Sequence, residues 1–89
     1  MNVTTAADFL RAGLKHMEDR AKTYDKPEGE RSMRATVHAF QQITGIHISE
    51  EQGWLLMAIL KAVRSQQGGY RADSYEDGAA YFALAGEAA

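Results

Sequence analysis

Residues 54–60 read Trp-Leu-Leu-Met-Ala-Ile-Leu, an uninterrupted apolar run in a chain of only 89 residues. The residues just before it, Ser-Glu-Glu-Gln at 49–52, form a capping-box pattern, which predicts that a helix begins there. A helix that is apolar on all sides has to be covered on all sides. We therefore expect this helix either at the centre of the fold or at an interface between subunits.

Three further segments have helical spacing, and none alternates as a strand would. Thr4 or Thr5 can cap the first, Gly45 can end the second in the left-handed conformation, and Asp-Ser-Tyr-Glu at 73–76 can start the last as a second capping box. The first segment carries an apolar stripe of Leu10, Leu14, Met17, Ala21 and Tyr24. The sequence predicts an all-α compact bundle of about four helices in a single domain, 1–89, with helices at 4–24, 30–44, 49–66 and 74–87.

The composition excludes several classes of protein. Ten Lys and Arg against twelve Asp and Glu give a net charge of −2, whereas domains that bind nucleic acid by bulk electrostatics are usually basic. The chain has no cysteine, which excludes disulfides and thiolate metal sites. It has no signal-peptide pattern and no apolar run of the roughly 18–20 residues that a membrane span needs. We expect a soluble intracellular protein.

The short chain also predicts self-association. A domain of this size buries only about 60% of the surface of its unfolded chain, so a subunit interface is the expected source of further buried area. The apolar helix supplies the candidate interface residues, Trp54, Leu55 and Met57. We expect a homo-oligomer, and the same surface could instead bind a different protein.

A polar cluster is predicted where the third helix meets the fourth. Lys61 and Arg64 are three residues apart on one helical face, and Asp73 and Asp77 are four apart on another. Either a cation pairs with a carboxylate across the helix hairpin, or the cations line a pocket for an anion. The two carboxylates could also contact a divalent cation, but a pair supplies too few ligands for Mg²⁺ by itself.

A second polar group surrounds the turn at residues 25–29. Arg31 and Arg34 fall in the first turns of the second helix, where free backbone N–H groups favour an anion. The alternative is an ordinary charged surface. The hypothesis of a small-ligand site therefore includes Tyr24, Arg31, Arg34, Lys61, Arg64, Tyr70, Asp73 and Asp77.

Residues 40–49 followed by a helix also imitate a helix-turn-helix, with Gly45 at the turn. A recognition helix should begin with polar or basic residues, yet this one begins with Glu50 and Glu51, which would meet phosphate. DNA binding is therefore kept only as an alternative.

The sequence resembles a family of small phage and prophage proteins of unknown function. The resemblance spans residues 20–87 and rests on Tyr24-x-x-Pro27-x-Gly29-Glu30-Arg31-Ser32-Met33, Gly53-Trp54-Leu55-x-Met57, Lys61-x-x-Arg64 and Gly69-Tyr70-x-x-Asp73-Ser74-x-x-Asp77-x-x-x-Tyr81. It implies a phage accessory protein in the cytoplasm of a bacterial host, acting in host takeover or counter-defence.

The ending Asp73-Ser74-x-x-Asp77-x-x-x-Tyr81 is also similar to the last helix of MazG-type all-α nucleotide pyrophosphohydrolases. Those enzymes hold Mg²⁺ with four carboxylates from two helices, and the third helix of this chain lacks the required pair. We therefore expect a non-enzymatic binding module, without cofactor, for a nucleotide-like anion or a host protein. An Mg-dependent nucleoside triphosphate pyrophosphohydrolase is the alternative.

Overall fold

The computed structural model describes residues 4–24 and 32–89, and the described residues form an all-α fold, as predicted. The helices are α1 (Ala6–Tyr24), α2 (Ser32–Thr44), α3 (Glu50–Ser65) and α4 (Ala72–Ala88). Each agrees with a predicted helix to within two residues at the ends that are described. The predicted start of α2 at residue 30 lies outside the described residues.

Local sequence signals account for three of the helix ends. Thr5 and Asp8 cap α1 reciprocally, since the Asp8 N–H donates to the Thr5 hydroxyl and the Thr5 N–H donates to the Asp8 carboxylate. Ser49 and Gln52 form the predicted capping box at the start of α3. Gly45, with φ of 76°, adopts the left-handed conformation directly after α2.

The start of α4 differs from the prediction. The helix begins at Ala72, its N-cap is Arg71, and no side chain makes a cap hydrogen bond there. Asp73 and Ser74 therefore lie within the first turn and do not precede it. The predicted capping box fails because each of its acidic ends has another partner: Asp73 accepts hydrogen bonds from Arg71, and Glu76 contacts His16.

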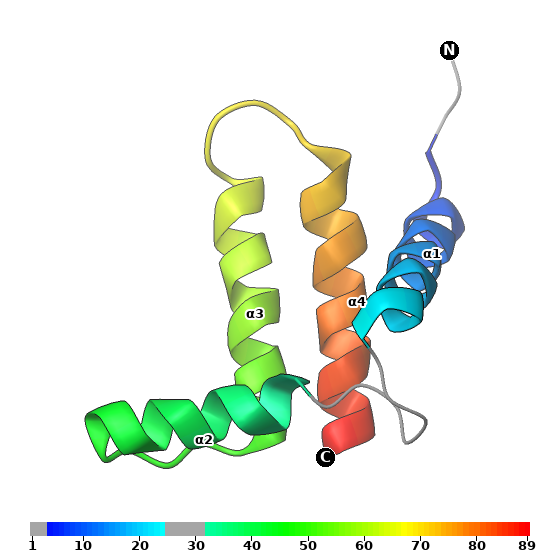
Figure 1. The fold of residues 1–89 in the computed structure, drawn as a ribbon. Coiled ribbons are helices and arrows are strands. Elements are labelled where there is room, and N and C mark those ends of the chain that lie inside the picture. Colours follow the sequence, from blue (N-terminus) through cyan, green and yellow to red (C-terminus); the bar gives the residue numbers. More distant parts are fainter. Residues whose placement is uncertain (1–3, 25–31) are drawn as a thin grey trace.

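The centre of the fold is an antiparallel hairpin of α3 and α4, as Figure 1 shows. Helix α1 lies against α4 on the side away from α3, and α2 crosses the base of α3 and projects sideways (Figure 1). The core is small and lies where α2, α3 and α4 meet. It consists of Met33, Val37, Trp54, Leu84 and Ala85, with Met17, Ile48, Met57 and Tyr81 packed against it.

Helix α1 packs through a different face from the predicted stripe. Leu10 and Leu14 are exposed, and Gly13 is buried against α4, where a Cβ atom would lie 2.8 Å from the carbonyl oxygen of Glu76. The glycine lets the two backbones approach closely, so backbone contact and not the apolar stripe decides the rotation of α1. Among the stripe residues whose side chains the structure describes, Met17 is the one that packs against the core.

Helix α3 is covered on one side only. Trp54 is buried and stacks on Tyr81, with ring centroids 5.8 Å apart, and Met57 is half-buried against the core. The large side chains on the remainder of the helix surface are exposed: Leu55, Leu56, Ile59, Leu60 and Val63. No helix in the described part of the chain is both long enough and apolar enough to span a membrane.

Candidate functional site

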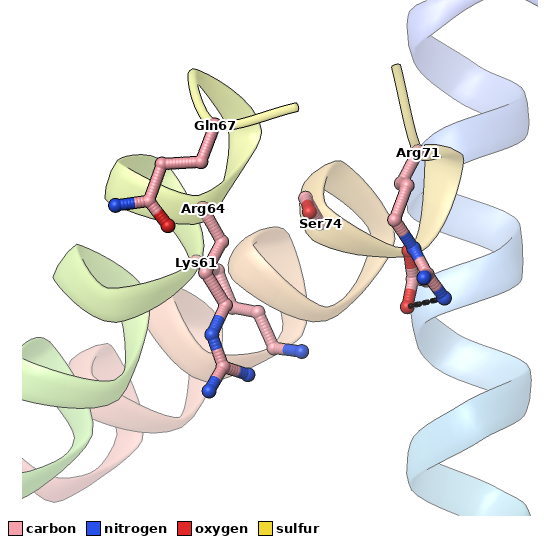
Figure 2. A pocket seen from close by; sticks show the side chains of 6 residues that line it. Lys61, Arg64, Gln67, Arg71 and Ser74 are labelled. Atoms are coloured by element: carbon pink, nitrogen blue, oxygen red, sulfur yellow. Dashed lines mark hydrogen bonds and ion pairs between the residues drawn. The ribbon is translucent and has the colours of Figure 1, made fainter. Parts of the chain in front are cut away.

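A cavity of about 390 Å³ lies at the end of the hairpin where α3 turns into α4. We call it the α3–α4 cavity; it is lined by Lys61, Arg64, Gln67, Arg71, Asp73 and Ser74 (Figure 2). The local sequence explains the arrangement. Lys61 and Arg64 share a face in the last turns of α3, Gly68 lies in the turn with φ of 68°, and Arg71 follows as the N-cap residue of α4.

The cavity lining is positively charged. It holds three cationic side chains and the single carboxylate of Asp73. Arg71 donates to both carboxylate oxygens of Asp73 at 3.2 and 3.4 Å, the contact dashed in Figure 2. The hydrogen bond from Arg71 lowers the pKa of Asp73 below its ordinary value of 3.8, so this carboxylate stays ionised at neutral pH.

Lys61 pairs across the hairpin, as one of the two sequence interpretations expected. Its Nζ lies 3.3 Å from Oδ2 of Asp77, and both side chains are largely buried. Arg64 makes no ion pair with any residue that the structure describes, although it lines the same cavity as Lys61. The salt bridge and the pocket therefore coexist, and Arg64 lines the pocket without an ion-pair partner among the described residues.

Ser74 adds a buried hydroxyl to the lining. Its residue is 7% exposed, and within the described ranges its side chain has no hydrogen-bond partner. In Figure 2 it lies between the side chains of α3 and Arg71. Leaving such a hydroxyl unpaired costs about 1–3 kcal/mol, so its burial at this position needs an explanation.

A second cavity, of about 410 Å³, opens between α1 and α4 and is lined by His16, Asp19, Arg20, Asp73 and Asp77. Nε2 of His16 lies 2.9 Å from Oε1 of Glu76, and Arg20 donates to the Tyr81 hydroxyl at 3.2 Å with its guanidinium 5.4 Å from the ring centroid. Asp73 borders both cavities.

The α1 residues of this second cavity are not among the candidates that the sequence predicts. His16 is half-buried there. The signal that was available is spacing: Gly13, His16 and Arg20 recur at three- and four-residue steps, which places them on one face of α1. Only the packing of α1 on α4 brings that face to Glu76 and Tyr81.

The other predicted ligand-binding residues do not gather at the α3–α4 cavity. Arg34 is on α2 and pairs with Glu50 at 3.0 Å. Tyr70 is exposed in the loop next to Arg71, and its ring stacks on Tyr75 with centroids 5.9 Å apart. Arg31 and the side chain of Tyr24 lie outside what the structure describes.

The predicted interface residues are divided by the packing of α3. Trp54 and Met57 pack inside the chain, whereas Leu55 is 39% exposed. The exposed apolar surface of this helix therefore lies on the side opposite Trp54. We also find no group of three or more His, Asp or Glu side chains, within residues 4–24 and 32–89, arranged to hold a metal ion.

Comparison with known proteins supports one part of the expected resemblance. No curated protein and no solved structure is significantly similar to this chain. One family model matches residues 10–89, and it is described as a domain of unknown function, DUF6378. The match covers almost the whole chain and includes α2, α3, α4 and the part of α1 from Leu10 onward. The chain belongs to the DUF6378 family.

Proposed function

We propose that this protein is a non-enzymatic binding module that holds a small phosphate-bearing anion in the α3–α4 cavity. The observation that carries the proposal is the pair formed by Ser74 and Arg64. A buried hydroxyl and a guanidinium, neither with a hydrogen-bond or ion-pair partner among the described residues, line one cavity at the start of a long helix.

Each of these groups suits a phosphate oxygen. Arg64 can donate two parallel hydrogen bonds to a phosphate, and the Ser74 hydroxyl can donate a third. The N-terminus of α4 is uncapped by any side chain, and its dipole favours negative charge. The bound anion would thus satisfy the Ser74 hydroxyl and neutralise Arg64 at once.

The size and surroundings of the cavity favour a nucleotide over free phosphate. A volume of about 390 Å³ exceeds what one phosphate group fills. Tyr70 does not line the cavity, but its exposed ring belongs to the loop between α3 and α4, and a nucleobase that extends beyond the cavity could stack on it. We therefore propose a nucleotide-like anion as the ligand.

The biological setting of this proposal comes from the sequence resemblance. A phage or prophage protein in the cytoplasm of a bacterial host could sequester a nucleotide signal as a form of counter-defence. Binding of a host protein, DNA binding and pyrophosphohydrolase activity stay as alternative predictions.

The test is isothermal titration of the protein with inorganic phosphate, pyrophosphate and a panel of nucleoside mono-, di- and triphosphates and cyclic dinucleotides. We expect at least one nucleotide to bind more tightly than phosphate. Arg64→Ala should weaken that binding at least 10-fold, since it removes a charge-assisted contact of about 1.5–3 kcal/mol. Arg34→Ala is the matched control, because it removes the same charge from the ion pair between Arg34 of α2 and Glu50 of α3. This variant should bind the nucleotide as tightly as the wild type.

Ser74→Ala separates a binding role from a structural one. Without ligand, this variant should be as stable as the wild type or more stable, because it removes an unpaired buried hydroxyl. With ligand, it should bind more weakly. The proposal is refuted if no anion in the panel binds, or if Arg64→Ala and Arg34→Ala weaken binding equally. Mg²⁺-dependent release of pyrophosphate, lost in Asp77→Asn, would favour the enzymatic alternative instead.

A further inference from the structure

Asp73 lines the α3–α4 cavity, and binding of an anion does not explain its presence there. Among the six described residues that line the cavity it supplies the only carboxylate, beside the cationic side chains of Lys61, Arg64 and Arg71. A phosphate bound at Arg64 and Ser74 would be repelled by this negative charge. For a bare phosphate Asp73 would only weaken binding, so its position indicates a ligand that also carries hydrogen-bond donors.

The carboxylate of Asp73 keeps capacity to accept hydrogen bonds. Arg71 uses one position on each oxygen, since its Nε donates to Oδ1 at 3.2 Å and its Nη2 donates to Oδ2 at 3.4 Å. An ionised carboxylate has about four acceptor positions, so about one is left on each oxygen. The side chain of Asp73 is 44% exposed, which leaves these positions accessible to a ligand.

Asp73 lies beside the position proposed for the phosphate. Ser74 is the next residue of α4, and consecutive residues of a helix point about 100° apart. Ser74 is buried, whereas Asp73 borders both this cavity and the cavity between α1 and α4. In Figure 2 Ser74 lies between the cationic side chains of α3 and Arg71, from which the dashed contact leads to Asp73. The part of a ligand that adjoins its phosphate can therefore reach Asp73.

A ribose supplies the donors that this position requires. In a nucleotide the sugar adjoins the phosphate, and its 2′ and 3′ hydroxyls are neighbours that can each donate to one oxygen of a carboxylate. An acidic residue accepts the ribose 2′ hydroxyl in the same way in many dinucleotide-binding domains. A divalent cation also suits a carboxylate near phosphate, but here it would meet Lys61, Arg64 and Arg71 in the same cavity. The charge of the lining therefore favours hydroxyl groups over a metal ion.

We propose that Asp73 binds the ribose hydroxyls of the ligand and makes the α3–α4 cavity selective for ribonucleotides over 2′-deoxyribonucleotides. The inference rests on the proposed function, since it takes the phosphate to be bound at Arg64 and Ser74. A 2′-deoxyribonucleotide leaves one oxygen of the ionised carboxylate without its donor. Loss of one hydrogen bond to a charged group weakens binding by about 10-fold or more.

Isothermal titration with matched pairs of nucleotides tests the selectivity. The probes are the 5′-mono-, di- and triphosphates of the four common ribonucleosides, each with its 2′-deoxy counterpart, in a buffer that contains EDTA. We expect the wild type to bind at least one ribonucleotide about 10-fold more tightly than its deoxy counterpart.

Asp73→Asn separates a selective role from a structural one. This variant should bind both members of each pair with nearly equal affinity, and it should bind the deoxy member at least as tightly as the wild type does, because it removes negative charge from the cavity. A structural defect would weaken binding of both members. Asp19→Asn is the matched control, because Asp19 is 51% exposed and paired with Lys15 but does not line the α3–α4 cavity, and it should keep the wild-type preference.

The outcomes distinguish this proposal from the proposed function. Equal affinity of the wild type for both members of every pair would overturn the ribose contact and leave the phosphate site, which Arg64→Ala tests, in place. A preference that Asp73→Asn and Asp19→Asn retain alike would also overturn it, as would a preference that appears only when Mg²⁺ replaces EDTA. If a cyclic dinucleotide binds and no member of any pair does, the ribose proposal alone fails; if no anion binds, both proposals fail.

Discussion

The contact between α1 and α4 at Gly13 supports a quantitative prediction. A Cβ atom at this position would lie 2.8 Å from the Glu76 carbonyl oxygen and 3.7 Å from the Ala80 side chain. Because the first distance is shorter than real Cβ contacts, the Gly13→Ala variant has to move α1 outward by several tenths of an ångström. That movement lengthens the hydrogen bond from Arg20 to Tyr81, now 3.2 Å.

The net effect is the difference between two opposing contributions. Overpacking of a close contact costs about 1–3 kcal/mol, and the weakened hydrogen bonds add about 0.5–1 kcal/mol. Replacing a helical glycine by alanine returns about 1 kcal/mol of helix propensity. We expect Gly13→Ala to lower the free energy of unfolding by about 0.5–3 kcal/mol, which at about 4–8 °C per kcal/mol for a chain of this length lowers the Tm by roughly 2–24 °C.

Thermal and urea unfolding followed by circular dichroism measures this change, at one protein concentration because self-association would shift the Tm. Gly86→Ala is the matched control, since Gly86 lies in α4 and a Cβ atom there has no neighbour within 4 Å. That variant should gain about 0.5 kcal/mol from propensity alone. If Gly13→Ala is stabilised as much as Gly86→Ala, the close approach of α1 to α4 is refuted.

Two further predictions concern the ionised groups of α4. Lys61 and Asp77 are largely buried, and Nζ of Lys61 lies 3.3 Å from Oδ2 of Asp77. Asp77→Ala should therefore destabilise the fold more than the double variant Lys61→Met/Asp77→Ala, because the single variant leaves a buried charge without its partner. A double-mutant cycle measured by urea unfolding tests this, and additive changes in the free energy of unfolding would contradict the pairing. The pKa of Asp73 is lowered in the folded state, so its contribution to stability is complete above the unfolded value of 3.8 and is lost as the pH falls through the folded value. The Asp73→Asn variant should therefore lose less free energy of unfolding than the wild type as the pH falls below about 4. If the free energy of unfolding depends on pH in the same way in both proteins from about pH 2 to 6, the contact between Arg71 and Asp73 is contradicted.

The two sides of α3 differ in what they contact. One side packs on α4 and positions Lys61 and, at its edge, Arg64 at the α3–α4 cavity. The other side carries the exposed side chains of Leu55, Leu56, Ile59, Leu60 and Val63. The apolar run at residues 54–60 predicted a helix that is covered on all sides. In the structure the chain itself buries the side of this helix that carries Trp54, whereas the side that carries Ile59 is exposed.

Much of the fold was predictable from the sequence because its signals are local. The capping box at Ser49, the left-handed Gly45 and the spacing of apolar residues each act within a few residues, and all three predicted the observed helices. The pairing of Lys61 with an aspartate across the hairpin was also predictable, since a short turn forces α3 and α4 together. The start of α4 was not, because Arg71 and His16 compete for the acidic groups that would have capped it.

By itself, the sequence determined the all-α class, four helices and the candidate cations at the α3–α4 turn, since periodicity, capping and chain reversal depend on neighbouring residues. Only the tertiary structure decided which face each helix buries. The rotation of α1 depends on the Gly13 contact with α4, and the burial of the Ser74 hydroxyl beside Arg64 depends on how α4 lies against α3. Those contacts join residues far apart in the chain, and local preferences carry no information about them.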